Sequence, residues 1–245
     1  MKLIVAGASG FVATEVIRQS LSMPKVTSVV AVARRPVSAP SNPGPDADTS
    51  KLHSVVLDDY GSYADEVTKH FASADACIWT VAITPRKSRG IDFKEVRRVC
   101  QDATLAGLQA MFEARSKAGN NAKPLRFMYV SGSATERDQN KTPRYMPQYC
   151  LMRGETENRV LAFAAEHKDA VEACVSKPGL ITAPGQILKT MSAMVMKSVI
   201  SVPNVDIREI SAAMLNQVVN GFEKEPLENE DLVRIGRKVL EDTTV

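Results

Sequence analysis

The chain has 245 residues, of which 44% are hydrophobic and 24% charged, and this is the composition of an ordinary globular protein rather than of a disordered one. Its 31 basic and 28 acidic residues leave a formal net charge of +3 and are spread along the chain. This charge pattern predicts neither a nucleic-acid-binding surface nor attachment to an anionic membrane. A chain of this length buries enough surface to fold without a metal or disulfide staple, so we predict one domain over residues 1–245.

Cysteine and histidine are scattered along the sequence, without a CxxC pair or metal-ligand spacing. We therefore expect no metal site, and we expect reduced thiols of the kind found in cytoplasmic proteins. The first apolar run is too short for a signal peptide, and no run reaches 18 apolar residues. These features predict a cytoplasmic protein that does not enter the membrane. The cysteines are Cys77, Cys100, Cys150 and Cys174.

Short apolar runs alternate with longer amphipathic ones, which is typical of a parallel sheet with crossover helices. Most of the short runs lack polar alternation, as expected of strands that are buried on both faces. The pattern predicts an α/β fold with a Rossmann-type, doubly wound parallel sheet. The expected strands are 2–6, 28–33, 54–57, 76–81, 126–131 and 171–176, and the expected helices are 11–22, 62–72, 91–117, 148–166 and 208–223.

Two segments depart from this alternation. Residues 36–50 contain four prolines and no apolar run, which predicts a mobile surface loop. After Pro178 the pattern becomes irregular, so we expect a small C-terminal lobe at about 180–245 that covers the mouth of the site. Residues 83–90 and 183–205 follow strand ends and are expected to shape a pocket. Within the second segment, Met191, Met194 and Met196 indicate either an adaptable apolar wall or ordinary core.

A glycine-containing turn follows the first expected strand and precedes an amphipathic helix. Residues 7–13 read GASGFVA, in which Gly7 allows a tight turn, Gly10 allows close approach to a pyrophosphate, and Ala13 allows close packing of helix on strand. The helix N-terminus adds unpaired N–H groups and a positive dipole end. Glycines also serve turns for steric reasons alone. We predict a dinucleotide-binding turn at Gly7, Ser9, Gly10, Phe11 and Val12.

The ends of the next strands carry further candidate cofactor contacts. Arg34 and Arg35 follow the second strand, where arginine accommodates a ribose 2′-phosphate and a carboxylate would bind the 2′-hydroxyl. The pair favours NADP(H) over NAD(H), although it can also be a solvated basic pair. Asp58 can accept a hydrogen bond from an adenine amine, or it can cap the following helix. Thr80, Val81 and Ala82 close the fourth strand at the edge where ligands bind.

A tyrosine and a basic residue share one face of the helix expected after the fifth strand. Tyr149 and Arg153 are four residues apart, and a cation beside a phenol lowers its pKa from about 10, which suits a general acid or base. The alternative is a surface pair or a core tyrosine. At the end of the fifth strand, Ser131 is the candidate hydroxyl for orienting a substrate carbonyl, with Ser133 as its competitor.

Six segments together resemble one protein family. They are GASGFVA, the ARR at residues 33–35, YCLMRGETE, KPGL, AMLNQVV and LENEDLVRIG, and they resemble the atypical short-chain dehydrogenase/reductases, in particular the Tat-interacting oxidoreductase-like branch. The resemblance covers nearly the whole chain, and residues 36–50 match least. The GxxGxxA spacing is similar to that of the extended and atypical members.

The resemblance implies an NADP(H)-binding Rossmann protein in which Tyr149 takes the place of the catalytic tyrosine. Arg153 takes the place of a lysine that contacts the nicotinamide ribose, and arginine keeps the charge but cannot relay a proton. The resemblance also places the turn formed by Pro178, Gly179 and Leu180 beside the nicotinamide.

Three functions follow from these features. The first is an NADPH-dependent reductase that acts on a carbonyl or activated alkene of a small organic molecule. The second is an NADP(H)-binding regulator or scaffold without turnover, and the third is a non-redox isomerase or cyclase on the same fold. In each case we expect a small-molecule ligand and a monomer or homodimer.

Overall fold

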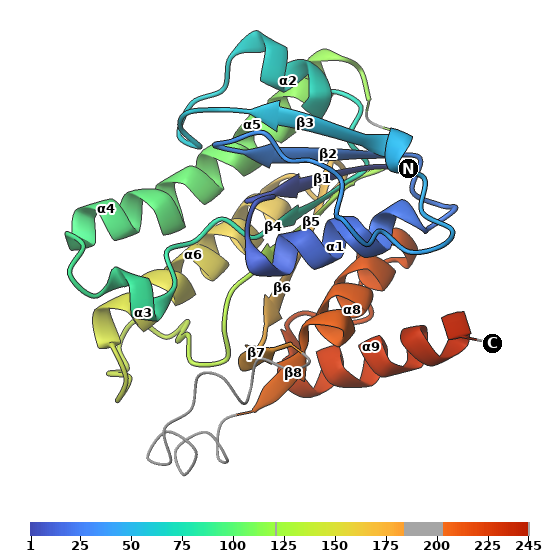
Figure 1. Cartoon of the computed structure of the whole chain (residues 1–245). Helices are drawn as coiled ribbons and strands as arrows, with labels where there is room; N and C mark the ends of the chain where they lie inside the picture. The colour runs from blue at the N-terminus through green and yellow to red at the C-terminus, as the bar shows by residue number, and fades with distance from the viewer. Residues whose placement is uncertain (121, 184–202, 245) are drawn as a thin grey trace.

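The structure of the chain is a computed structural model that describes residues 1–120, 122–183 and 203–244. Seven strands of the described chain form one parallel sheet in the order β3-β2-β1-β4-β5-β6-β9 (Figure 1). The order reverses between β1 and β4, which is where open α/β sheets bind ligands beyond their carboxyl ends. The strands are β1 (Lys2–Ala6), β2 (Ser28–Ala33), β3 (Leu52–Val56), β4 (Ala76–Trp79), β5 (Leu125–Val130), β6 (Val171–Lys177) and β9 (Leu227–Glu228).

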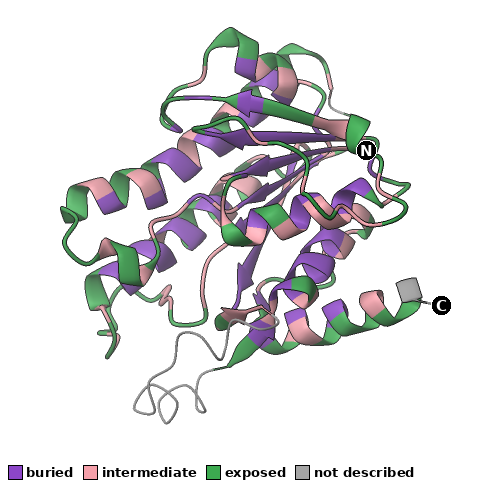
Figure 2. Ribbon diagram, in the orientation of Figure 1, coloured by how far each residue is buried: buried purple, intermediate pink, exposed green. Residues whose placement is uncertain are grey.

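Helices cover both faces of the sheet and bury it (Figures 1 and 2). Alternate side chains of a strand point to opposite faces, so Leu3 and Val5 belong to one apolar cluster and Ile4 and Ala6 to the other. The predicted doubly wound α/β fold is confirmed. One face carries α1 (Phe11–Leu21), α8 (Ile207–Asn220) and α9 (Asn229–Thr244), and the other carries α2 (Asp65–Phe71), α5 (Ala103–Lys117) and α6 (Pro147–Glu166).

The helix predicted over residues 91–117 is found over residues 93–117, with a π-helical turn inside it. The chain forms α3 (Pro85–Ser88), then α4 (Phe93–Arg97), a π-helical turn (Arg98–Asp102) and finally α5. Helix α4 begins after Ile91 because the side chain of Asp92 accepts a hydrogen bond from the Lys94 N–H at 2.9 Å and caps the new helix. The apolar periodicity of this region predicts neither the N-cap at Asp92 nor the extra residue in the π-helical turn.

The described part of residues 180–245 is divided between two sheets. Strands β7 (Leu180–Thr182) and β8 (Asn204–Asp206) form a separate parallel pair, whereas β9 pairs with β6 at the edge of the main sheet. Helix α8 begins with a capping box made by Asp206 and Glu209, and it packs against α1 and α9. Strands β7, β8 and β9 and helix α9 were not among the elements predicted from sequence. Met191, Met194 and Met196 lie outside the described residues.

Helix α6 lies unusually close to the chain that follows β5. A Cβ atom added to Gly154 would stand 1.7 Å from the carbonyl oxygen of Glu136, which is a backbone atom that cannot move independently. Glycine at this position therefore lets α6 approach the segment after β5. Because Arg153 precedes Gly154 and Tyr149 lies one turn earlier, the same contact sets the position of both candidate site residues.

We expect Gly154→Ala to lower the free energy of unfolding by about 3 kcal/mol, because the added methyl group overlaps backbone atoms. Urea denaturation followed by circular dichroism measures this loss. Gly61→Ala is the control, since a Cβ there would meet only the side chain of Asp59, at 3.4 Å. A Gly154→Ala protein as stable as the Gly61→Ala protein would contradict the close approach.

Candidate functional site

The turn between β1 and α1 has the geometry of an anion-binding turn. Gly7 adopts φ +79°, and a Cβ there would stand 2.6 Å from Oγ1 of Thr80, so both the backbone and the space require glycine. Gly10 is the N-cap of α1, and no side chain caps the helix. The N–H groups of the first turn, at Phe11 and Val12, therefore face the edge of the sheet without a side-chain acceptor among the described residues.

Two side chains hold this turn in place. Thr80, directly after β4, donates its hydroxyl to the carbonyl oxygen of Ala6 at 2.8 Å. Tyr60, after β3, donates its hydroxyl to the carbonyl oxygen of Val32 at 3.0 Å and accepts the Gly7 N–H at 3.2 Å. Sequence reasoning missed Tyr60, because its role depends on a contact across the carboxyl ends of three strands. Thr80 lies against the turn, and its place beside the cofactor stays a prediction.

The candidate adenosine contacts lie at the same edge. Arg34 and Arg35 are exposed after β2, and neither side chain has a hydrogen bond or ion pair with a described residue. Asp58 is exposed after β3. Its alternative interpretation as a helix cap is wrong, since α2 begins at Asp65 and its N-cap is Ala64. Val81 is buried and Ala82 half-buried in the loop that follows β4, because β4 ends at Trp79, two residues earlier than predicted.

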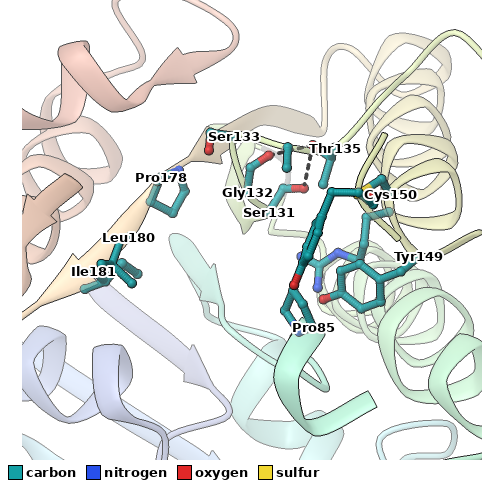
Figure 3. Close-up of a pocket in the computed structure, with 14 residues that line it drawn as sticks. Pro85, Ser131, Gly132, Ser133, Thr135, Tyr149, Cys150, Pro178, Leu180 and Ile181 are labelled. Carbon is teal, nitrogen blue, oxygen red and sulfur yellow. Dashed lines mark hydrogen bonds between the residues drawn. The ribbon is translucent and has the colours of Figure 1, made fainter. Parts of the chain in front are cut away.

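A cavity of about 570 Å³ opens beside this edge and brings together six of the predicted site residues. In Figure 3, Tyr149 and Cys150 lie on one side, Pro178, Leu180 and Ile181 on the other, and the turn from Ser131 to Thr135 between them. The volume is that of a small-molecule site. The six residues are Ser131, Tyr149, Arg153, Pro178, Gly179 and Leu180.

The turn after β6 is fixed by its neighbours. The Leu180 N–H donates to the carbonyl oxygen of Pro203 at 2.8 Å, and the Gly179 N–H donates to Oδ1 of Asn229 at 2.9 Å. The carbonyl oxygen of Pro178 accepts the N–H of Ser133 at 2.8 Å. This turn therefore joins β8, α9 and the segment after β5, and it forms one wall of the cavity.

Tyr149 and Arg153 lie on one face of α6, as their spacing predicts, and both are buried. The Tyr149 hydroxyl donates to the carbonyl oxygen of Ile83 at 2.9 Å. Arg153 is 3% exposed, donates from Nη2 to the carbonyl oxygen of Val130 at 2.7 Å, and stands 5.0 Å above the ring centroid of Tyr129. Its Nε has no acceptor, and no carboxylate pairs with it among the described residues.

Burial decides the protonation state of Tyr149. It raises the pKa of the phenol above its ordinary value, and the Arg153 guanidinium acts in the opposite direction without overcoming it. The sequence-based expectation of a lowered pKa is therefore wrong in its net direction. With only 7% of Tyr149 exposed, the loss of water outweighs one nearby cation. Tyr149 is a neutral phenol at neutral pH and can give up a proton.

The two candidate serines differ in their partners. The Ser131 hydroxyl donates to Oε1 of Glu157 at 2.5 Å, and Thr135 donates to the same oxygen. Ser133 is exposed, and its hydroxyl has no partner among the described residues. The hydroxyl of Ser131 is thus engaged in a hydrogen bond within the protein, whereas the hydroxyl of Ser133 is available to a ligand.

Glu157 is fully buried on α6, and sequence reasoning missed it. Its Oε2 accepts Nε of Arg137 at 2.7 Å and lies 3.5 Å from Nζ of Lys177. Arg137 in turn pairs with Glu225, before β9. The only sign of Glu157 in the sequence was its spacing of four residues from Arg153, which places it on the face of α6 that carries Tyr149.

Two further properties concern metals and membranes. In residues 1–120, 122–183 and 203–244, no group of histidine, cysteine and carboxylate side chains could hold a metal ion. Over the same ranges, no helix has the length and apolar character needed to cross a membrane. The four cysteines are buried, and none of them forms a disulfide within this part of the chain.

No protein-family model matches the chain, and no curated protein sequence matches it. Solved structures match it at low identity. MoeE5 in complex with UDP-glucuronic acid and NAD has a TM-score of 0.64 at 18% identity, over 92% of this chain and 74% of that one. DesIV, the dTDP-glucose 4,6-dehydratase from Streptomyces venezuelae with NAD and TYD bound, has a TM-score of 0.65 at 15% identity, over 98% and 81%. Gre2 from Candida albicans in complex with NADPH has a TM-score of 0.64 at 17% identity, over 90% and 75%.

These likenesses show the fold of the chain. A Rossmann-type sheet is shared with an enzyme that acts on a nucleotide sugar and with proteins solved in complex with NAD or NADPH. None of these three structures singles out the Tat-interacting branch, which stays a prediction.

We expect Tyr149 to titrate above pH 10, because its folded pKa is raised above the ordinary value of about 10. The difference in near-ultraviolet phenolate absorbance between the wild type and Tyr149→Phe measures this directly. The difference is expected to be absent at neutral pH and to develop only above about pH 10. In an Arg153→Met background the midpoint moves further upward, since the opposing cation is gone. A midpoint below 10 would restore the expectation of an activated phenolate.

Proposed function

We propose that the chain is an NADP(H)-dependent oxidoreductase of the short-chain dehydrogenase/reductase type, which reduces a carbonyl or activated alkene of a small organic molecule. One observation carries this proposal: the uncapped glycine turn and a cavity lined by Tyr149 and Arg153 lie at the same carboxyl edge of one sheet. The fold likeness to proteins solved with NAD or NADPH supports it. Within this proposal, the protein belongs to the Tat-interacting oxidoreductase-like branch, is located in the cytoplasm, and is a monomer or a homodimer.

The residues at the edge fit a phosphorylated dinucleotide. The first-turn amides of α1 would hold the pyrophosphate, and Gly10, which has no side chain, would admit its close approach. Arg34 and Arg35 are exposed and form no hydrogen bond or ion pair with a described residue, so they are available to a 2′-phosphate. When bound, NADPH supplies a hydride.

The chain's own residues supply the proton. Tyr149 is neutral and donates its hydroxyl hydrogen, which is now directed at Ile83, to the substrate oxygen. Arg153 stabilises the phenolate that remains, because a buried cation attracts a newly formed negative charge more strongly than it would in water. Ser133 orients the substrate oxygen with the hydroxyl that the protein leaves available.

A non-redox reaction is the second candidate. It is favoured by the number of solved structures of similar fold whose names are those of nucleotide-sugar epimerases. Net consumption of NADPH separates the two, because an epimerisation or isomerisation leaves the amount of reduced cofactor unchanged. Tight NADP(H) binding without conversion of any compound would instead favour the regulatory alternative.

We expect the double variant Arg34→Ala/Arg35→Ala to bind NADPH about 100-fold more weakly, since each lost charge-assisted hydrogen bond is worth about 1.5–3 kcal/mol. NADH binding is expected to change by less than about threefold, because it lacks the 2′-phosphate. Fluorescence titration of both cofactors measures the ratio. Equal losses for NADPH and NADH would remove the argument for NADP(H).

We expect Tyr149→Phe to lower kcat for NADPH oxidation by about 10²- to 10⁴-fold and Ser133→Ala by about 10²-fold, with NADPH affinity retained in both. Ser131→Ala is the matched comparison. It removes a buried hydrogen bond to Glu157 and is expected to lower the free energy of unfolding by about 1–3 kcal/mol with a smaller effect on kcat. A Tyr149→Phe enzyme with normal turnover would show that the proton comes from another group.

A further inference from the structure

A second cavity lies on the other side of Tyr149. It has a volume of about 410 Å³ and shares Tyr149 with the first cavity. Five of its lining side chains are apolar: Ile91, Phe93, Val96, Met146 and Pro147. Because the two cavities meet at Tyr149, they leave room for a ligand that extends in both directions from the Tyr149 hydroxyl.

Apolar side chains are exposed at the mouths of both cavities. Ile91 is 40% and Phe93 36% exposed at the second, and Tyr145 and Leu180 are exposed at the first. Large apolar side chains gathered around a concave site indicate that an apolar ligand covers them. The body of the ligand is therefore expected to be apolar.

Helix α3 borders both cavities and is divided into two faces. Pro85 lines the first cavity and Ser88 the second, and both are half-buried. Arg86, Lys87 and Arg89 are exposed, and none of their side chains has a hydrogen bond or ion pair within the described parts of the chain. Arg86 and Lys87 on α3, and Arg89 directly after it, thus supply three available cations next to residues that line the cavities.

Two neighbouring arginines do not share this property. Arg97 pairs with Glu155 at 3.0 Å, and Arg98 pairs with both Asp59 at 2.8 Å and Glu95 at 2.7 Å. Carboxylates therefore neutralise Arg97 and Arg98, whereas Arg86, Lys87 and Arg89 stay uncompensated. A local excess of positive charge at the rim of an apolar cavity attracts an anionic group.

We propose that the substrate is an amphipathic anion: its apolar body occupies the two cavities that meet at Tyr149, and its anionic group lies against Arg86, Lys87 and Arg89. A carboxylate, a sulfonate or a phosphate has the required charge. The proposal rests on the proposed function, because it names the substrate class of that same cavity. The cations of α3 serve the substrate, while Arg34 and Arg35 serve the cofactor.

A pair of fluorescent probes tests the ligand class without turnover. 1-Anilinonaphthalene-8-sulfonate has an apolar body and a sulfonate, and N-phenyl-1-naphthylamine has nearly the same body without the charge. We expect the wild type to bind the sulfonate saturably and about tenfold more tightly than the amine, with and without saturating NADP+. A tenfold preference corresponds to about 1.4 kcal/mol, which three exposed charges of about 0.5 kcal/mol each supply together.

The triple variant Arg86→Ala/Lys87→Ala/Arg89→Ala is expected to lose about tenfold in affinity for the sulfonate and less than twofold for the amine. The control is Lys117→Ala/Lys123→Ala/Lys168→Ala, which removes the same charge from exposed positions near the opposite edge of the sheet and is expected to keep the preference. Phe93→Ala is expected to weaken both probes, because it removes part of the apolar wall.

Three results would overturn the inference. They are equal binding of the two probes by the wild type, a preference that survives in the triple α3 variant, and complete displacement of the sulfonate by NADP+. A triple α3 variant that loses NADPH affinity as strongly as the Arg34/Arg35 variant would also reassign these cations to the cofactor. Failure of the proposed function gives a different pattern, in which the wild type binds no NADPH and the probe preference remains.

Discussion

The buried carboxylate of Glu157 holds together the segments that form the cavity. It accepts the hydroxyls of Ser131 and Thr135 from the turn after β5, and it pairs with Arg137 and Lys177. A carboxylate with no exposed surface is costly to bury unless cations and hydrogen bonds compensate it, and here two cations and two hydroxyls do so. Because these partners come from β6 and from the segment between β5 and α6, while Glu157 lies on α6, the walls of the cavity are fixed relative to one another.

This constraint explains why the two serines have different roles. Ser131 stands at the end of β5, where a catalytic hydroxyl is expected, but the nearest acceptor inside the protein is Glu157. Giving up that bond would leave a buried carboxylate with one donor fewer. Ser133 is two residues further along and is held through its backbone N–H by Pro178, so its hydroxyl stays open to the cavity. The structure thus separates a serine that supports the site from one that can contact a ligand.

The sequence predicted those features that depend on local patterns. The apolar runs predicted most of the strands, because a strand buried on both faces has few polar positions. The glycines predicted the turn before α1. The features that it missed depend on contacts between distant segments. Tyr60 reaches across three strand ends, Glu157 is recognisable only once Arg137 and Lys177 lie beside it, and β9 has two residues, too few for a pattern. The raised pKa of Tyr149 was missed for the same reason, because it results from burial by segments that are distant in the sequence.

The protonation of Tyr149 bears on the direction of the reaction. A reductive step requires a group that still holds its proton when the substrate arrives, and a neutral phenol in an apolar cavity meets that requirement over a wide pH range. An oxidative step requires the phenolate first, and in this cavity burial opposes it. Arg153 has no carboxylate partner among the described residues, so its charge is available to the phenolate that appears after proton transfer. Under the proposed function, the same buried cation that fails to activate the resting phenol would stabilise the phenolate left by proton donation, and this arrangement favours the reductive direction.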